Sequence, residues 1–106
     1  MIQVKELVNT TNKEEFINKK TLRRRFAELS LSSVQHVRRG LEEDTISIVD
    51  YFIHSLIDNS GMAHVLGIIT EDELDGIVDL AIISTQLIKP LALIAIDMLD
   101  ELLQNL

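Results

Sequence analysis

The last third of the chain, Glu71–Leu106 (EDELDGIVDLAIISTQLIKPLALIAIDMLDELLQNL), decides the predicted fold. Apolar residues fill most of this stretch, and its polar residues recur at helical spacing. Thr70 and Glu73 form a capping-box pattern in front of it, and the acids that follow complement the positive end of a helix dipole. The stretch therefore predicts helix over residues 71–89 and again over residues 91–106.

Pro90 separates these two predicted helices. A proline has no backbone N–H and disfavours helical geometry at the residue before it. No turn residues are visible between the helices, so the sequence predicts one long kinked helix or two helices that meet at a sharp angle. A straight helix over residues 71–106 would be about 50 Å long at roughly 1.5 Å per residue, too long for a compact domain of this size.

Helices that are apolar around most of their circumference must be covered around most of it. Residues 62–106 contain 26 apolar residues out of 45, and the charged first half of the chain offers little apolar surface to cover them. We therefore expect an intertwined or bundle-type homodimer built through residues 46–106. The positions expected in its core are Leu74, Val78, Ala81, Ile88, Leu91, Ile94, Leu99 and Leu102.

The remaining sequence is also mostly helical in pattern, which predicts a single all-α domain of four to six helices over the 106 residues. Four glycines and one proline are too few for an all-β protein. A capping-box pattern at Thr11–Glu14 predicts a short helix near residues 12–20. Residues 46–59 carry apolar side chains at helical spacing, and Asn59–Gly61 is expected to end that helix. Two segments stay open between helix and strand, residues 45–53 and 62–69.

Charge divides the chain into a basic segment, residues 1–43, and an apolar and acidic segment, residues 44–106. The first holds nine basic residues and six acids (+3), and the second holds one basic residue and eleven acids (−10). Such a division predicts one of two arrangements. Either the two segments neutralise each other, within a protomer or across an oligomer, or the basic segment meets phosphates or an acidic partner.

The basic residues concentrate between positions 19 and 39. Ser30–Ser33 is expected to interrupt the helix there, because serine competes for backbone hydrogen bonds, and the result has the outline of a helix-turn-helix. The stretch Leu29–Asp44 (LSLSSVQHVRRGLEED) resembles the recognition helix of winged-helix regulators. No β-wing follows it, since residues 46–59 are predicted to be helical, so the sequence is assigned to no family. The expected contact residues are Lys19, Lys20, Arg23, Arg24, Gln35, Arg38 and Arg39.

No catalytic or cofactor motif is apparent. The chain has no cysteine, and His36, His54 and His64 form no pair with metal-ligand spacing. His54 is expected to be a hydrogen-bonded core or interface residue. No Gly-rich phosphate loop and no nucleophile signature occur. The sequence therefore predicts a protein that is not an enzyme and uses no metal, cofactor or small-molecule substrate.

The function predicted from these features is that of a small regulatory binding protein that contacts nucleic acid through basic helices within residues 19–39. The alternative is a protein-binding adaptor, inhibitor or immunity protein, such as a phage- or plasmid-type antagonist, that acts through an acidic and apolar helical surface. A cytoplasmic location is expected, because the first residues contain no apolar segment typical of a secretory signal. Leu80–Leu99 is not expected to span a membrane, since Lys89 and Pro90 would lie at its centre.

Overall fold

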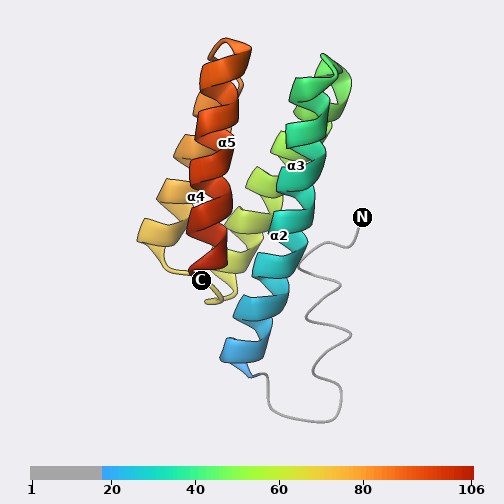
Figure 1. The fold of residues 1–106 in the computed structure, drawn as a ribbon. Helices are drawn as coiled ribbons and strands as arrows, with labels where there is room; N and C mark the ends of the chain where they lie inside the picture. Colours follow the sequence, from blue (N-terminus) through green and yellow to red (C-terminus); the bar gives the residue numbers. More distant parts are fainter. Residues whose placement is uncertain (1–17) are drawn as a thin grey trace.

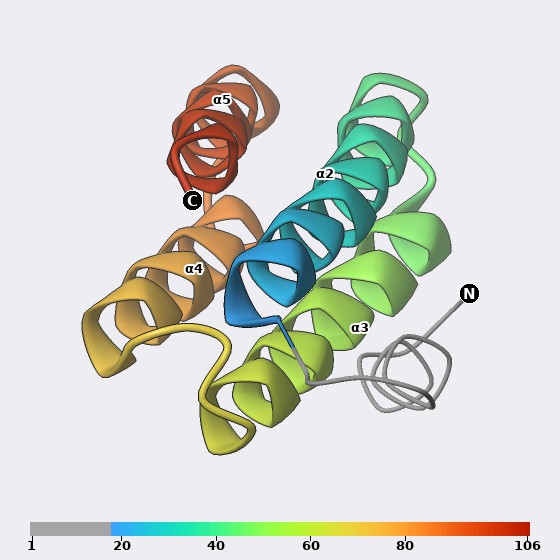
Figure 2. The same cartoon turned by 90° about the horizontal axis from the view of Figure 1, so that it is seen from below.

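The structure, a computed structural model, describes residues 18–106, and these form four helices and no strand. The helices are α2 (Lys19–Glu42), α3 (Ile46–Val65), α4 (Glu71–Ser84) and α5 (Lys89–Gln104). They run alternately up and down, so that consecutive helices are antiparallel (Figure 1). Both α2 and α4 pack against α3 and α5, which closes the four helices into one bundle (Figure 2). The predicted all-α class is confirmed for these residues.

The start of α2 is set by Asn18. Its side-chain oxygen accepts hydrogen bonds from the backbone N–H groups of Lys20 and Thr21, at 3.0 and 3.3 Å. An asparagine cap of this kind satisfies N–H groups that have no partner inside the helix. The predicted capping box at Thr11–Glu14, and the part of the predicted helix that precedes Asn18, lie outside the described residues.

The predicted break at Ser30–Ser33 is wrong, because α2 is one continuous helix. Ser30 and Ser33 are buried, and the Ser33 hydroxyl lies 3.5 Å from the carbonyl oxygen of Leu29. A small hydroxyl side chain can bond to the preceding turn of its own helix, so it fits a buried helix face without ending the helix. The predicted helix-turn-helix therefore does not form, since its turn is absent.

Close packing of α2 against α3 depends on Gly40. A Cβ atom at this position would lie 2.9 Å from Cγ2 of Val49, which is closer than carbon atoms pack. The chain then reverses through Asp44, whose φ of 55° lies in the left-handed region that aspartate tolerates better than most residues. Thr45 is the residue that precedes the first turn of α3.

The predicted end of α3 at Asn59–Gly61 is also wrong, since the helix continues to Val65. Asn59 and Ser60 face the bundle interior and are buried within the helix. The helix ends before Gly67, whose φ of +75° favours glycine. The structure decides both segments that the sequence left open between helix and strand. Residues 45–53 are helical apart from the cap at Thr45, and residues 62–69 are the end of a helix followed by a turn.

The chain reverses direction between α4 and α5 at Thr85–Ile88. The hydroxyls of Ser84 and Thr85 donate to carbonyl oxygens of the preceding turn, at 2.7 Å each, where α4 ends. Pro90 lies in the first turn of α5, where the missing N–H costs nothing. The predicted helix over residues 71–89 is too long by one turn. The single kinked helix is therefore wrong, and the chain forms two separate helices, as the second alternative predicted. The expected absence of turn residues is also wrong, because Thr85–Ile88 supplies a turn before Pro90.

The hydrophobic core runs along the bundle axis and takes side chains from all four helices. Phe26, Ile53, Ile77 and Leu99 are examples of fully or almost fully buried members. The antiparallel pair α4 and α5 therefore covers part of its apolar circumference within one chain. Among residues 18–106, no helix combines the length and hydrophobicity that crossing a bilayer requires.

Candidate functional site

The structure separates the seven predicted contact residues into two groups. One group is bonded within the chain and consists of Arg23, Gln35 and Arg38. The other is exposed on α2 and consists of Lys19, Lys20, Arg24 and Arg39. The predicted basic surface is therefore smaller than the sequence suggested.

Arg23 joins four segments of the bundle. Its guanidinium donates two parallel hydrogen bonds to the Glu73 carboxylate, at 2.9 and 2.8 Å. It also donates to the main-chain oxygens of Ile68 and Leu106, at 3.1 Å each. A planar guanidinium suits this two-point recognition of a carboxylate. One side chain of α2 thus ties together the loop before α4, the first turn of α4 and the end of the chain after α5.

Glu73 serves the capping box and the ion pair at once. The Thr70 backbone N–H donates to Oε1 of Glu73 at 2.8 Å, and the Thr70 hydroxyl accepts from the Glu73 backbone N–H at 3.2 Å. The hydrogen bond from Arg23 is the main reason that the pKa of Glu73 is lowered from 4.5 to about 2, against the opposing effect of burial. The same hydrogen bond raises the pKa of Arg23. The predicted capping box at Thr70 and Glu73 is confirmed.

Glu73→Gln should make the protein less sensitive to acid. A carboxyl whose pKa is lowered on folding stabilises the folded state above its unfolded pKa, and that contribution is lost as the pH falls through the folded pKa. For Glu73 the loss occurs between pH 4.5 and about 2. We expect the free energy of unfolding of the wild type to fall more steeply over this range than that of Glu73→Gln. Urea unfolding at several pH values measures this, and parallel curves would contradict it.

Arg38 and Gln35 connect α2 to the acidic side of α5. Arg38 forms ion pairs with Asp97 and Asp100, the second at 3.6 Å, and Gln35 donates to Asp100 at 3.3 Å. Lys89, the first residue of α5, pairs with Asp44, which lies in the turn between α2 and α3, at 2.9 Å. The ion pairs of Arg23 and Arg38 support the first of the two predicted arrangements, in which the basic and acidic segments neutralise each other within a protomer. The pair of Lys89 and Asp44 lies within the acidic segment.

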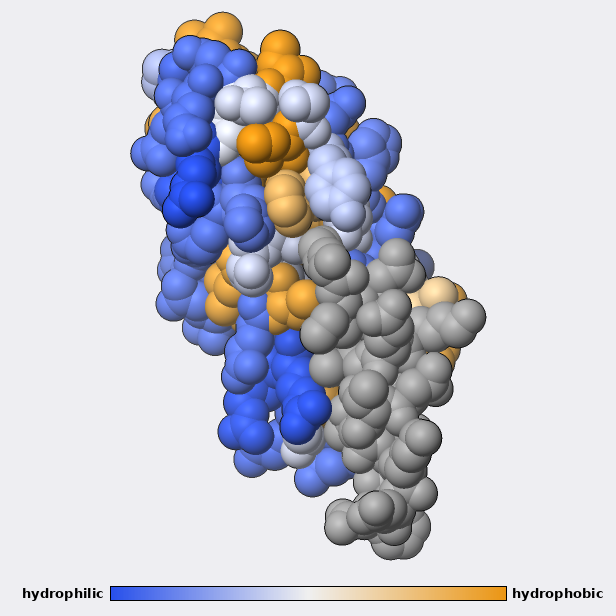
Figure 3. Space-filling view, turned by 90° about the vertical axis from the view of Figure 1, so that its right-hand side faces the viewer, coloured by the Kyte–Doolittle hydropathy of each residue, from blue (hydrophilic) through white to orange (hydrophobic). Residues whose placement is uncertain are grey.

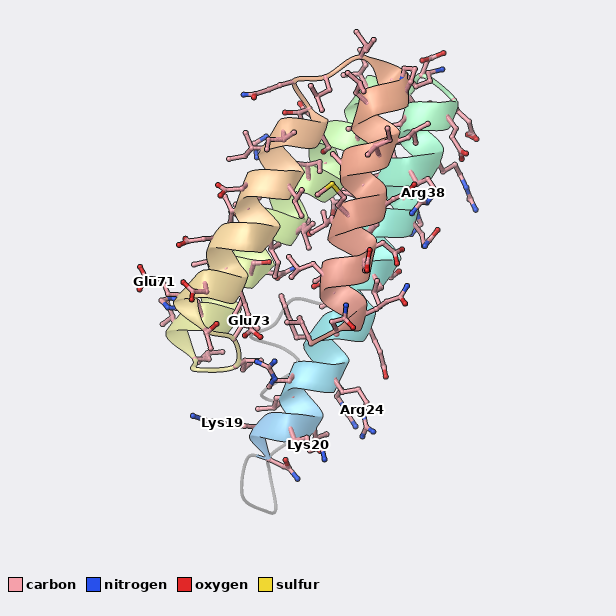
Figure 4. The ribbon with its side chains drawn as sticks, turned by 60° about the vertical axis from the view of Figure 1, so that its left-hand side comes forward. Lys19, Lys20, Arg24, Arg38, Glu71 and Glu73 are labelled. Atoms are coloured by element: carbon pink, nitrogen blue, oxygen red, sulfur yellow. The ribbon has the colours of Figure 1, made fainter. Side chains whose placement is uncertain are left out.

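The exposed cations lie mainly at the first turns of α2. Figure 4 shows Lys19, Lys20 and Arg24 on the part of α2 that extends beyond the other helices, pointing in different directions. A cleft of about 320 Å³ lies between this end of α2 and the end of α5. Its lining residues are Lys20, Thr21, Arg23, Arg24, Ala27, Leu103, Gln104 and Leu106.

The positions predicted for an oligomer core have three different environments. Ala81 and Leu99 are buried within the single chain, and Leu74, Val78 and Leu102 are partly buried there. The remaining three positions are exposed, namely Ile88, Leu91 and Ile94.

Large apolar side chains are exposed over much of the bundle. Figure 3 shows apolar atoms reaching the surface among hydrophilic ones on the side that carries α2 and α3. The sequence pattern missed most of these residues, because a helix that is apolar on several sides does not reveal which side its neighbours leave uncovered. The exposed set is Ile46, Ile48, Tyr51, Met62, Val65, Leu66, Ile82, Ile83, Leu87, Ile88, Leu91, Ile94 and Met98.

Two of the three histidines have surroundings that the structure defines. His54 is exposed, so its predicted place in a core is wrong; it lines an open depression on α3 that also includes Asp50 and Asp58. His36 stacks on Phe52 with ring centroids 4.4 Å apart. Within residues 18–106, no three histidine or acidic side chains come together in a way that could hold a metal ion.

Comparison with known proteins finds no matching family model, no similar curated protein and no similar solved structure.

Proposed function

We propose that the protein is a small, non-enzymatic binding module that docks onto another protein through its exposed apolar surface. The observation that carries this proposal is the set of thirteen large apolar side chains that are exposed among residues 18–106. Single exposed apolar residues are ordinary, but exposed apolar residues that line one side of a helix, as Leu91, Ile94 and Met98 do on α5, mark interaction surfaces in folded proteins. Adaptors, inhibitors and immunity proteins share this way of acting.

The internal ion pairs favour protein binding over nucleic-acid binding. Arg23 and Arg38 would have to leave Glu73, Asp97 and Asp100 to contact phosphates, and each exchange would leave a carboxylate without its partner. The apolar surface needs no such exchange, because covering it with a partner removes it from water directly.

Affinity capture from cells that express the protein tests the proposal. The wild type is compared with Ile94→Gln/Met98→Gln, which changes exposed apolar residues of α5, and with Lys20→Ala/Arg24→Ala, which changes exposed cations. We expect that a partner protein is captured by the wild type and by Lys20→Ala/Arg24→Ala, and that a variant with changed exposed apolar residues no longer captures it. Recovery of nucleic acid alone, lost with the cation variant, would refute protein binding.

A homodimer, as predicted from the sequence, is one way to cover part of this surface. Sedimentation at micromolar concentration distinguishes the states. A mass of twice the chain mass of 12.0 kDa would support the homodimer. A mass of 12.0 kDa at every concentration would leave the exposed apolar surface to a different protein.

Phosphate binding is the second candidate function, because Lys20 and Arg24 are exposed beside a cleft that is large enough for an anion. On this hypothesis, Lys20→Ala/Arg24→Ala should weaken nucleic-acid binding and make the log–log salt dependence shallower by roughly one unit for each lost contact. Fluorescence anisotropy with labelled duplex and single-stranded DNA and RNA measures both quantities. The hypothesis fails if the wild type binds none of these at about 50 mM salt, where nonspecific phosphate contacts are strong.

A further inference from the structure

The outer side of α4 and α5 carries an apolar seam between the two helices. Gly76 and Leu102 mark one close contact between the helices, since a Cβ atom at Gly76 would lie 3.2 Å from Cδ2 of Leu102. Ile83 lies seven residues after Gly76, two turns further along the same side of α4. On α5, Met98 and Leu91 precede Leu102 by four and eleven residues, which places them along the same side of that helix.

This seam is exposed rather than closed. Leu91, Ile94 and Met98 are 47%, 55% and 54% exposed, and Ile83 is 42% exposed. Leu91, Ile94 and Met98 follow the spacing i, i+3, i+7, which makes one continuous apolar ridge on α5. We call these four residues the seam face, and Figure 4 looks onto the two helices that form it.

Acidic residues border the seam face. Asp72 and Asp79 lie four residues before and three after Gly76, beside the seam on α4, and Glu101 lies seven residues after Ile94 on α5; all three are exposed. α4 contains five acids and no lysine or arginine. A partner that covers the seam face must therefore approach negative charge from both helices.

We infer that the seam face binds an amphipathic helix of a partner protein whose apolar stripe is flanked by lysine or arginine. An apolar ridge beside a second helix takes a third helix through anchors at i, i+3 or i+4, and i+7. The bordering acids select the charge of that helix, because like charges across an interface are costly and opposite charges guide binding. This inference rests on the proposed function and names the partner's chemistry.

The same charges disfavour a second copy of this chain on the seam face. A twofold interface places the same patch on both sides, so the acids of α4 and Glu101 would approach their own counterparts. Lys89 is the one basic residue of residues 44–106, and it pairs with Asp44. A second copy therefore brings little positive charge to this face from its own α4 and α5.

Three designed peptides of 16 residues provide the probe. The first is a helix with leucine at the anchor spacing and lysine elsewhere; the second replaces every lysine with glutamate; the third has the composition of the first in an order that forms no apolar stripe. We expect the first peptide to bind the full chain at least about tenfold more tightly than the other two, with an affinity that falls as salt rises. Fluorescence anisotropy of labelled peptides measures the affinities.

Two matched variants locate the binding. Ile94→Gln/Met98→Gln changes the seam face, whereas Met62→Gln/Val65→Gln changes two exposed apolar residues at the end of α3. We expect the first to weaken binding of the lysine peptide at least about tenfold and the second to leave it within about twofold. Because all four side chains are exposed, both variants should keep the wild-type helical signal. Asp79→Asn/Glu101→Gln keeps the apolar residues and should reduce the salt dependence.

Several outcomes would overturn the inference. Equal affinity for the lysine and glutamate peptides would show that the bordering acids do not select the charge of the partner. Equal loss of affinity in Ile94→Gln/Met98→Gln and Met62→Gln/Val65→Gln would show that the peptide does not bind specifically at the seam face. A dimer in sedimentation that Ile94→Gln/Met98→Gln dissociates would show that a second copy covers the seam face. If affinity capture yields a protein that is lost only with Met62→Gln/Val65→Gln, the proposed function stands and the seam face is not its site.

Discussion

Leu99→Asp should unfold the protein. Leu99 is fully buried, in contact with the core of the bundle. A carboxylate introduced there has no cation to pair with among the apolar core residues, and burying it costs several kcal/mol. Since small domains are stable by only about 5–15 kcal/mol, we expect most of the helical signal to be lost at 25 °C. Circular dichroism and urea unfolding measure this.

The adjacent residue supplies the control for this substitution. Met98→Asp introduces the same charge one position earlier on α5, but Met98 is 54% exposed, so the new carboxylate stays hydrated. We expect its free energy of unfolding to remain within about 1 kcal/mol of the wild type. Equal loss of stability in the two variants would show that the buried side of α5 has been assigned wrongly.

Arg23→Ala should be the most destabilising substitution of a basic residue on α2. It removes two hydrogen bonds to Glu73 and those to Ile68 and Leu106, and it leaves the Glu73 carboxylate, with 23% of its side-chain surface exposed, without its cation. Hydrogen bonds to charged groups contribute about 1.5–3 kcal/mol each when a partner is removed. We expect a loss of about 3 kcal/mol, measured by urea unfolding at neutral pH.

Two further variants separate the ion pair from general effects of charge. Arg24→Ala removes an exposed cation on the next position and should change stability by less than about 0.5 kcal/mol. Arg23→Ala/Glu73→Ala should lose less than the sum of the two single variants, because neither partner is then left alone. Additive losses would show that Arg23 stabilises the fold through packing of its aliphatic part instead.

The contrast between Arg23 and Arg24 also bears on function. Both were predicted to contact a partner, yet only Arg24 is exposed, whereas Arg23 is committed to Glu73. A loss of binding in Arg23→Ala alone would therefore reflect loss of the fold. Tests of phosphate binding should change Lys20 and Arg24, and should leave Arg23 and Arg38 in place.

Local signals in the sequence were sufficient where the hydrogen bonds are local. The capping box of Thr70 and Glu73 closes within three residues, so its pattern is readable without the fold, and the structure has it. Helical periodicity likewise identified the all-α class and placed Leu99 in the core. The division of charge between the two segments was also plain from composition.

The tertiary structure alone decided where polar residues would be buried and where the chain would turn. Ser30 and Asn59 were expected at helix ends, but both lie inside helices. Neighbouring helices bury them, so packing outweighs their local preference for a helix end. Thr85–Ile88 looked like helix, because a short apolar turn has the same composition as the helices around it.

Which basic residues form ion pairs within the chain could not be predicted either, because this also depends on contacts between helices. The partner of Arg23 lies fifty residues away along the chain, and no periodicity within α2 indicates it. Exposure of the seam face is likewise a property of how α4 packs on α5, since each helix has more apolar surface than one neighbour can cover. The class of elements and the balance of charge follow from the order and type of the residues. The packing of the bundle determines which charges are paired and which apolar residues are left for a partner.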